Sequence, residues 1–310
     1  MTGRGATGPI GFVGLGSMGA AIAGHLLDEG HELVVWNRSA GPVEELVARG
    51  AIRAGSIADT LATGTVFSML SNESVVFDLF DADALSAAPE GTVHVDMATI
   101  GAAAATRLTG LHAEHGVAYV AAPVLGRPPV AAAGQLTVLA AGPPEVLDRV
   151  RPVLETIGRR VWDFGSDPSA ANAVKIGVNF LIIHALQGLS ESITMLEQRD
   201  IDTERFVELL GDSLFPGVVY SGYGAAIARR SYEPALFTTE LGFKDLMLAL
   251  DTARATGVSF PSESALRGVF ESALDEGQAE LDWASIAEVT RRRVRPGSTD
   301  ATAAPRERRP

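Results

Sequence analysis

The first half of the chain alternates short apolar runs with helix-like stretches, and this rhythm constrains the fold more than any other feature. Six runs of four to six residues are mostly apolar throughout, rather than at every second position. Strands with this pattern are covered on both faces, as in a parallel sheet with helices on either side. The alternation therefore predicts an open, doubly wound α/β sheet. Its expected strands are residues 10–13, 33–36, 65–69, 93–97, 117–120 and 136–141.

The pattern changes near Asp167. A long helical pattern without proline covers residues 169–197 and follows the start signal Asp167-Pro168-Ser169. Only helical patterns follow, at residues 202–210, 239–256, 262–275 and 284–294. We therefore expect a sheet domain at 9–166, an all-helical second domain at 167–296 joined by a long interdomain helix, and a flexible tail at 297–310.

Composition limits the classes of protein to be considered. A chain of 310 residues, 46% of them hydrophobic, can bury two cores, so disorder throughout is excluded. The absence of cysteine excludes disulfides and thiolate zinc sites, and the scattered histidines have no metal-ligand spacing. No apolar run reaches the length of about 18 residues that a membrane helix needs, and no apolar signal segment begins the chain. The expectation is a cytoplasmic protein with no membrane partner and no metal.

The charge distribution argues against a nucleic-acid partner. The formal net charge is −13, which disfavours binding to polyanions. Residues 291–310 carry seven arginines against Asp300 and Glu307, so this stretch has a charge of +5 and the remainder −18. The run Arg291-Arg292-Arg293 is expected to end a helix, where cations complement the helix dipole.

The first apolar run leads into a glycine-rich motif. Gly14-Leu15-Gly16-Ser17-Met18-Gly19 follows residues 10–13 and opens a helical pattern. In that context G-x-G-x-x-G predicts a dinucleotide site, with glycines for the turn, for the approach of a pyrophosphate and for close helix packing. The helix N-terminus offers N–H groups to the phosphates. The alternative is a glycine-rich turn in an α/β protein without nucleotide.

The end of the second apolar run bears on which dinucleotide binds. Sites that prefer NAD usually carry Asp or Glu there to hold the ribose 2′-hydroxyl, whereas this chain has Asn37-Arg38-Ser39. Arginine can hold a 2′-phosphate through two N–H groups. We therefore predict that this site prefers NADPH to NADH, against the alternative that Arg38 is a surface residue without a ligand.

Only two lysines, Lys175 and Lys244, occur among the 25 basic residues. Arginine stays protonated, whereas a buried lysine can titrate near neutral pH. Lys175 shares one face of an otherwise apolar helical pattern with Asn172 and Asn179, which is typical of a cleft lining. Lys175 is thus a candidate for proton transfer. The alternative is a lysine that extends to solvent beside polar neighbours.

Four stretches together make the chain similar to the β-hydroxyacid dehydrogenase family, from about residue 9 to 290. This family includes 3-hydroxyisobutyrate dehydrogenases, tartronate semialdehyde reductases and glyoxylate/succinic semialdehyde reductases. The resemblance implies a Rossmann domain followed by an all-helical domain, often in a homodimer or homotetramer. The four stretches are 11–19, 122–126 (Ala-Pro-Val-Leu-Gly), 172–179 (Asn-Ala-Val-Lys-Ile-Gly-Val-Asn) and 243–246 (Phe-Lys-Asp-Leu).

The resemblance also implies roles for individual residues. Lys175 matches the catalytic lysine and Asn179 a residue that orients the substrate. On the cofactor, the implied contacts are Thr99, Lys244 and the segment Met69-Leu70-Ser71, in addition to the residues at 14–19 and 37–39. On the substrate, they are Val124, Leu125, Gly126, Asp245 and the aromatic Phe237.

The substrate loop departs from the family pattern. The family usually reads Pro-Val-Ser-Gly-Gly, with the serine helping to hold a substrate carboxylate, whereas Leu125 and Arg127 stand here. Leucine cannot hydrogen-bond a carboxylate, and losing such a partner costs about 1–3 kcal/mol. Either Arg127 takes over the anion or the substrate is less polar than a simple hydroxy acid.

Together these features predict an NADPH-dependent oxidoreductase that transfers hydride between nicotinamide and a small carbonyl or β-hydroxyacid-type substrate. Lys175 is expected to exchange the proton, while the cofactor supplies the hydride. One alternative is an imine reductase, although such enzymes commonly carry Asp or Tyr at the position of Lys175. The other is an NADPH-binding sensor without turnover.

Overall fold

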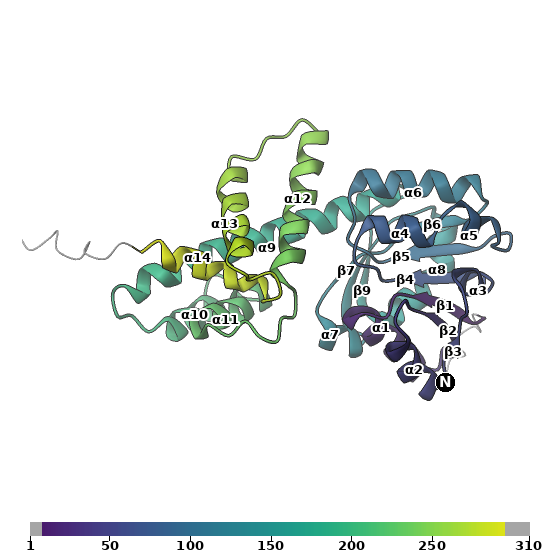
Figure 1. Cartoon of the computed structure of the whole chain (residues 1–310), viewed down its shortest axis with the longest axis horizontal. Helices are drawn as coiled ribbons and strands as arrows, with labels where there is room; N and C mark the ends of the chain where they lie inside the picture. The colour runs from purple at the N-terminus through teal and green to yellow at the C-terminus, as the bar shows by residue number, and fades with distance from the viewer. Residues whose placement is uncertain (1–7, 295–310) are drawn as a thin grey trace, which may run out of the picture. The chain divides into compact units, whose positions relative to one another are not determined.

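The computed structural model describes residues 8–294, and a six-stranded parallel sheet forms the centre of its N-terminal part (Figure 1). The strand order is β3-β2-β1-β4-β5-β6, and each neighbouring pair is parallel. The order reverses beside β1, as in a doubly wound Rossmann sheet, so the predicted fold class is confirmed. The strands are β1 (Ile10–Val13), β2 (Leu33–Trp36), β3 (Ile52–Arg53), β4 (Thr65–Ser68), β5 (Val93–Asp96) and β6 (Ala118–Ala121).

Helices cover both faces of this sheet and explain why its strands are apolar throughout. On one face, buried residues of β1 and β2 share a core with α1 (Ser17–Asp28), α2 (Ala40–Ala48) and α8 (Pro144–Ile157). The core of the other face contains α3 (Ile57–Leu61), α4 (Glu73–Leu79), α5 (Ala82–Ser86) and α6 (Ala102–Glu114). The carboxyl ends of β1, β4 and β5 therefore carry their loops to one edge of a rigid layer.

A second, three-stranded sheet follows β6. It contains β7 (Val124–Leu125), β8 (Leu136–Ala140) and β9 (Gly158–Asp163), with α7 (Pro128–Ala132) after β7. The sequence did not predict β3, β7 or β9, because β3 and β7 have two residues each and β9 exposes most of its side chains. The predicted last strand is β8, which belongs to this second sheet.

The remainder of the described chain is helical, which confirms the predicted all-helical part and its long helix. Among residues 168–294 the only strand-like feature is an isolated bridge between Thr238 and Asp282. The helices are α9 (Pro168–Glu197, 30 residues), α10 (Thr203–Asp212), a π-helical turn (Val219–Tyr223), α11 (Gly224–Arg229), α12 (Thr239–Ala255), α13 (Glu263–Asp275), a 3₁₀ turn (Trp283–Ile286) and α14 (Ala287–Arg292).

The chain divides into two compact units, and both α9 and α12 contribute to each. The first unit contains the residues up to Leu181 together with Lys244–Phe260, and the second contains Ile182–Phe243 together with the residues from Pro261 on. Early α9 and most of α12 thus pack with the Rossmann sheet. Candidate site residues on these two helix segments therefore share one unit with the cofactor loops.

Helix α9 is long and apolar enough to cross a membrane, although no such run was expected. Its most apolar window of 18 residues has a mean hydropathy of 1.3, and 39% of that window is buried. Core helices of globular proteins meet the same criterion. Buried residues of α9, such as Ile176 in the first unit and Leu186 and Ile193 in the second, are packed as in a core helix. The helix is therefore weak evidence for a membrane partner.

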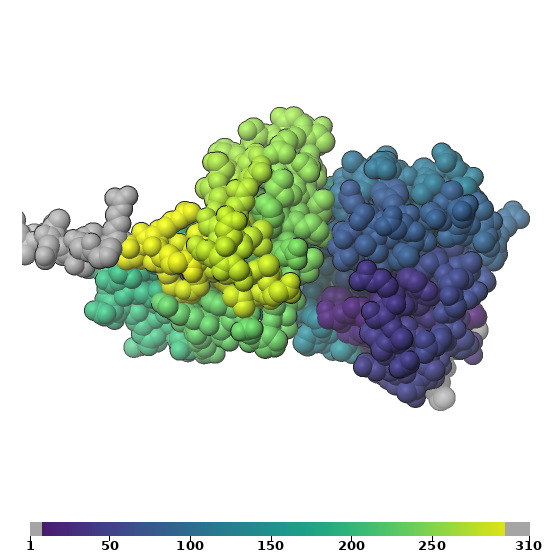
Figure 2. Space-filling model, viewed as in Figure 1, coloured from purple at the N-terminus to yellow at the C-terminus, as the bar shows by residue number. Residues whose placement is uncertain are grey.

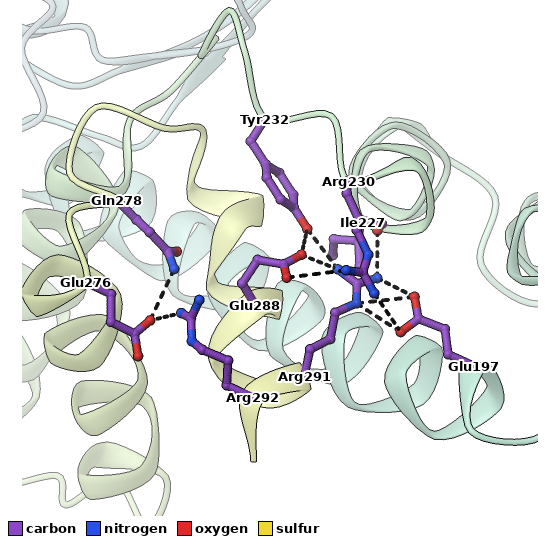
Figure 3. Close-up of polar contacts among 9 residues, drawn as sticks. All are labelled: Glu197, Ile227, Arg230, Tyr232, Glu276, Gln278, Glu288, Arg291 and Arg292. Atoms are coloured by element: carbon purple, nitrogen blue, oxygen red, sulfur yellow. Dashed lines mark hydrogen bonds and ion pairs between the residues drawn. The ribbon is translucent and has the colours of Figure 1, made fainter. Parts of the chain in front are cut away.

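The arginine run ends α14, as predicted, but its first member has a structural role that was not expected. Arg291 has a side chain only 6% exposed and donates to both carboxylate oxygens of Glu197, to Glu288 and to the hydroxyl of Tyr232 (Figure 3). Arg292 is half exposed and pairs with Glu276. Residues of α14, yellow in Figure 2, form part of the visible surface of the second unit. The predicted tail, 297–310, lies outside the described residues.

Candidate active site

The glycine-rich turn between β1 and α1 leaves room for a ligand at one glycine and is tightly packed at the other two. Gly14 has a φ of +91°, and a side chain there would collide with the carbonyl oxygen of Met69. A side chain at Gly19 would collide with the carbonyl oxygen of Gly14. By contrast, leaving aside Gly16 itself and its neighbours along the chain, no atom of the described residues lies within 4 Å of the position that a Cβ of Gly16 would take. The turn thus has the open approach that a pyrophosphate requires.

The N-terminus of α1 fits the same ligand. Gly16 is the cap residue, and no side chain accepts a hydrogen bond from the first turn. Ser17 is exposed, and the first turn holds no acidic residue that would repel a phosphate. Uncapped N–H groups at a helix N-terminus form an anion site together with the helix dipole. The residues present therefore fit a dinucleotide.

Of the three residues after β2, Asn37 makes hydrogen bonds that shape the glycine-rich turn, whereas Arg38 and Ser39 face solvent. The side-chain oxygen of Asn37 accepts a hydrogen bond from the amide of Leu15 at 2.9 Å, and its Nδ2 donates to the carbonyl of Ser39 at 3.1 Å. Arg38 and Ser39 are exposed. Within the described part of the chain, Arg38 makes no ion pair or side-chain hydrogen bond, so its guanidinium is available for an anionic ligand.

Lys175 lies early in α9 and is half-buried. The pKa of its amine is lowered to about 8: burial is the largest cause, the Asp245 carboxylate opposes the shift, and nearby Lys244 contributes to it. In the described residues, the Lys175 amine has no hydrogen bond or ion pair. An amine in this state is able to gain or lose a proton near neutral pH.

Asn179, one turn further along α9, connects this helix to α12. Its Nδ2 donates to Asp245 Oδ2 at 2.5 Å, and both side chains are buried. Asp245 Oδ1 lies 3.2 Å from the Nζ of Lys244. The structure buries this carboxylate against the helix that carries Lys175.

Lys244 ties α12 to two loops at the edge of the parallel sheet. Its Nζ donates to the carbonyl of Thr99 at 3.0 Å and to that of Ser71 at 3.3 Å. Thr99 follows β5, and Ser71 ends the segment 69–71 that follows β4. The first unit thus brings together the two lysines, Asn179, Asp245 and both of these loops.

The remaining expected site residues lie elsewhere or have less defined surroundings. Phe237 belongs to the second unit, where its ring packs edge-to-face on Trp283 with centroids 4.7 Å apart. Leu125 is half-buried and pairs with Thr137 across β7 and β8. The exposed Gly126 has a φ of +145°. The substrate roles of these residues, and of Val124, stay predictions.

The first unit contains two further buried polar side chains, those of Asn172 and His112. Asn172 Oδ1, on α9, is buried and has no hydrogen-bond partner in the described part of the chain. His112, one of the scattered histidines, is fully buried on α6, and its Nδ1 is hydrogen-bonded to the carbonyl of Leu108. Its apolar neighbours at 104, 105 and 108 were a signal in the sequence, because position 112 shares their helix face.

This fold and site define a nicotinamide-dinucleotide oxidoreductase with a Rossmann domain. Residues 9–165 match the NAD-binding domain of 6-phosphogluconate dehydrogenase, and residues 169–290 match the NAD-binding model of NADP-dependent 3-hydroxyisobutyrate dehydrogenase. The chain belongs to the β-hydroxyacid dehydrogenase family and is a dehydrogenase of the 3-hydroxyisobutyrate dehydrogenase type, acting on hydroxyl donors.

Two relatives and one solved structure align with nearly the whole length of this chain. An uncharacterised oxidoreductase of Bacillus subtilis, YfjR, is 36% identical and aligns with 89% of this chain and 98% of its own. The NAD-dependent L-serine dehydrogenase of Pseudomonas aeruginosa is 32% identical over 89% of this chain and 96% of its own. The structure of Mycobacterium tuberculosis 3-hydroxyisobutyrate dehydrogenase with L-serine has a TM-score of 0.82 at 26% identity, covering 92% and 99% of the two chains.

Proposed function

We propose that the protein is an NADPH-dependent oxidoreductase that interconverts a small carbonyl compound and its β-hydroxyacid-type alcohol, with Lys175 as proton donor and acceptor. The observation that carries the proposal is the Lys175 amine: it is half-buried, has no polar partner in the described residues, and has a pKa lowered to about 8. A bound nicotinamide supplies the hydride in reduction and takes it up in oxidation.

Lys175 would handle the proton that accompanies the hydride. As an ammonium it donates to the carbonyl oxygen, and as an amine it accepts the hydroxyl proton in the reverse direction. Asn179, which donates a hydrogen bond to Asp245, would help to orient the substrate. The unpartnered Oδ1 of Asn172, three residues before Lys175, offers an acceptor on the same helix face.

The cofactor would lie along the carboxyl edge of the sheet. The turn at 14–19 would hold the pyrophosphate, while segment 69–71, Thr99 and Lys244 would lie along the nicotinamide half. Exposed Arg38 has no partner in the described residues and would hold a 2′-phosphate, which supports NADPH over NADH. Asn37 and Ser39 would shape the adenosine end.

The substrate end is distinguished by Leu125. Because Leu125 is half-buried and cannot hydrogen-bond, it supports a substrate with an apolar group against this loop. It is equally compatible with a substrate whose carboxylate is held by another residue. Val124, Gly126 and Asp245 would complete the substrate contacts of the first unit. A substrate role for Phe237, in the second unit, stays a prediction.

The two predicted domains would have different functions. We propose that residues 9–166 bind the dinucleotide and that residues 167–296 serve the substrate and dimerisation. Large exposed apolar side chains in the second unit support a homodimer or homotetramer, among them Leu209, Leu214 and Val218. The protein would act in the cytoplasm on small molecules, and light scattering after size exclusion would measure the oligomer.

The test is a substrate screen that follows nicotinamide absorbance with NADPH and NADH. The panel holds short aldehydes, β-hydroxy acids with and without a carboxylate, and cyclic imines. Lys175→Ala and Lys175→Arg are expected to lower kcat by about 100- to 10,000-fold with NADPH affinity nearly unchanged. Near-normal turnover by either variant would exclude the proton role.

Two other outcomes identify the alternatives. Turnover of cyclic imines but not of carbonyls or alcohols would mark an imine reductase. Tight NADPH binding with no turnover of any compound, together with no effect of Lys175→Ala, would mark a cofactor-binding sensor.

A further inference from the structure

Four buried side chains in the first unit form a continuous hydrogen-bonded chain that the proposed reaction does not use. Ser68 and Asp96 end the neighbouring strands β4 and β5, His94 lies on β5 and His112 on α6, and none is more than 1% exposed. Asp96 Oδ1 lies 2.9 Å from Ser68 Oγ, and Ser68 Oγ lies 2.8 Å from His94 Nε2. On the other side of the ring, His94 Nδ1 lies 2.8 Å from His112 Nε2. The chain ends where His112 Nδ1 meets the carbonyl of Leu108 at 2.7 Å.

Counting hydrogens along this chain locates a proton. The Leu108 carbonyl can only accept, so His112 Nδ1 carries a hydrogen, and in a neutral imidazole Nε2 must then accept. By the same rule His94 donates from Nδ1 and accepts at Nε2, which takes the single hydrogen of Ser68. The contact between Ser68 and Asp96 then lacks a hydrogen unless Asp96 provides it. Four contacts need four hydrogens, and two neutral imidazoles and one hydroxyl supply three.

Burial decides which group holds the fourth hydrogen. Desolvation lowers the pKa of both histidines, His112 to about 4, and His115 opposes a charge on His112. Burial also raises the pKa of Asp96 to about 6, although hydrogen bonds from Ala98, Tyr119 and Ser68 oppose this rise. A Ser68 hydroxyl that donates to His94 instead no longer stabilises the carboxylate, so the acid form is favoured further.

Two of the groups packed around these four side chains oppose the acid form of Asp96: hydrogen bonds from Tyr119 and from the Ala98 amide lower its pKa, although the effect of burial outweighs them. Tyr119, on β6, donates to Asp96 Oδ2 at 2.9 Å, and burial raises the pKa of its hydroxyl, so it stays a donor. The ring of Phe80 stacks on His94 with centroids 3.8 Å apart and closes that side with apolar surface. No cation described in the structure pairs with the Asp96 carboxyl.

Asp96 connects this network to both loops that hold Lys244. The amide of Ala98 donates to Asp96 Oδ1 at 3.0 Å, which fixes the backbone just before Thr99. Ser68, the other neighbour of Asp96, is the residue from which segment 69–71 leaves β4. Lys244 donates a hydrogen bond to one carbonyl in each of these loops, those of Thr99 and Ser71. One carboxyl group thus links the two segments.

We infer that Asp96, as a carboxylic acid within the Asp96–Ser68–His94–His112 chain, is a positioning residue that holds segments 69–71 and 97–99 in the arrangement that binds the dinucleotide. The inference rests on the proposed function for the role of these segments. When the proton leaves, one contact in the chain has no hydrogen and a buried charge remains. The two segments then loosen, and dinucleotide affinity falls as pH rises.

The test combines histidine NMR with dinucleotide binding on the full chain. Selectively ¹⁵N-labelled histidine is expected to show His94 and His112 as neutral Nδ1–H tautomers at pH 6. NADPH dissociation constants are then measured from pH 6 to 9. The wild-type constant is expected to rise by about fivefold, the effect of one hydrogen bond. An Nε2–H tautomer at His94, or an imidazolium at either residue, would overturn the assignment of the proton.

Variants separate positioning from simple destabilisation. Asp96→Asn places a permanent N–H donor toward Ser68, so its pH-dependent rise should disappear. The bond from the Ala98 amide is lost at every pH, because the amide nitrogen that replaces Oδ1 cannot accept a hydrogen bond. Ser68→Ala should weaken binding about fivefold at pH 6 and also remove the rise. Thr92→Val deletes a buried hydroxyl just before β5, whose partner is the carbonyl of Pro89, and should keep the wild-type pH dependence.

Only differences between variants count, because Lys175 and the 2′-phosphate titrate equally in all of them. An Asp96→Asn protein that kept the wild-type rise in dissociation constant would overturn the inference. These readouts need no turnover. A chain that binds NADPH with the expected pH dependence but converts no substrate would defeat the proposed function and leave the role of Asp96 standing.

Discussion

The side-chain amide of Asn179 donates a hydrogen bond to the carboxylate of Asp245, 66 positions further along the chain. Asp245 also lies 3.2 Å from the amine of Lys244, which holds two backbone carbonyls at the edge of the sheet. A single buried carboxylate thus joins the helix that carries Lys175 to the helix that contacts the cofactor loops. Its charge also acts on Lys175, where it opposes the loss of the proton.

The pH dependence of turnover should have opposite signs in the two directions. The Lys175 pKa is lowered to about 8, so the amine predominates above this pH and the ammonium below it. Oxidation needs the amine, so its kcat should rise with pH and level off above about 8, whereas kcat for reduction should fall there. Rates in both directions from pH 6 to 10 measure this. Parallel profiles in the two directions would contradict a shared proton on Lys175.

Asp245→Asn should move both of these profiles to lower pH. The carboxylate raises the pKa of Lys175, so removing its charge lets desolvation lower that pKa further, while the amide oxygen can still accept from Asn179. Asp251→Asn is the matched control, because Asp251 lies on the same helix, is exposed and pairs with Arg254. A profile that moved to higher pH in Asp245→Asn would contradict the electrostatic role.

Arg38→Ala should change the choice of cofactor. Loss of a charged hydrogen-bonding partner, worth about 1.5–3 kcal/mol, is expected to lower kcat/KM for NADPH by about 10- to 100-fold. The value for NADH should change little, since NADH has no 2′-phosphate. Arg53→Ala, which removes another exposed arginine beside Glu44, should leave both values unchanged. An equal loss of kcat/KM with the two cofactors would show that Arg38 does not bind the 2′-phosphate.

Leu125→Ser should raise activity on substrates with a carboxylate. The new hydroxyl can donate to that carboxylate, so kcat/KM should rise by about tenfold for such substrates relative to uncharged carbonyls. Leu125→Ala separates the hydroxyl from the loss of volume and should not produce this preference. If both variants favoured carboxylates equally, cavity size rather than hydrogen bonding would determine specificity.

Arg291→Met should destabilise the second unit far more than Arg292→Met. The first substitution leaves Glu197 and Glu288 without their buried partner and is expected to cost about 3 kcal/mol in the free energy of unfolding. Arg292 is half exposed, and its pair with Glu276 should contribute less than about 1 kcal/mol. Denaturant unfolding measures both. Similar losses would mean that burial of Arg291 does not matter.

Sequence alone was sufficient for features that depend on neighbours along the chain. The parallel sheet followed from strands that are apolar throughout, because both of their faces are covered. The glycine turn followed from its place between β1 and α1, because the backbone there has conformational requirements that few residues meet. The helix face shared by Asn172, Lys175 and Asn179 followed from helical periodicity.

Tertiary structure decided what depends on contacts between distant segments. The burial of Asp245 against Asn179, of His112 against His94 and of Arg291 against Glu197 each joins residues at least 18 positions apart. For Asp245 and Arg291, nothing local distinguishes the side chain from an ordinary surface charge, because burial is set by which elements pack together. For His112, the apolar helix face at 104, 105 and 108 indicated burial but not that His94 would be its partner. The short strands β3 and β7 depend in the same way on partners supplied by the sheet, since two residues carry too little pattern to be recognised.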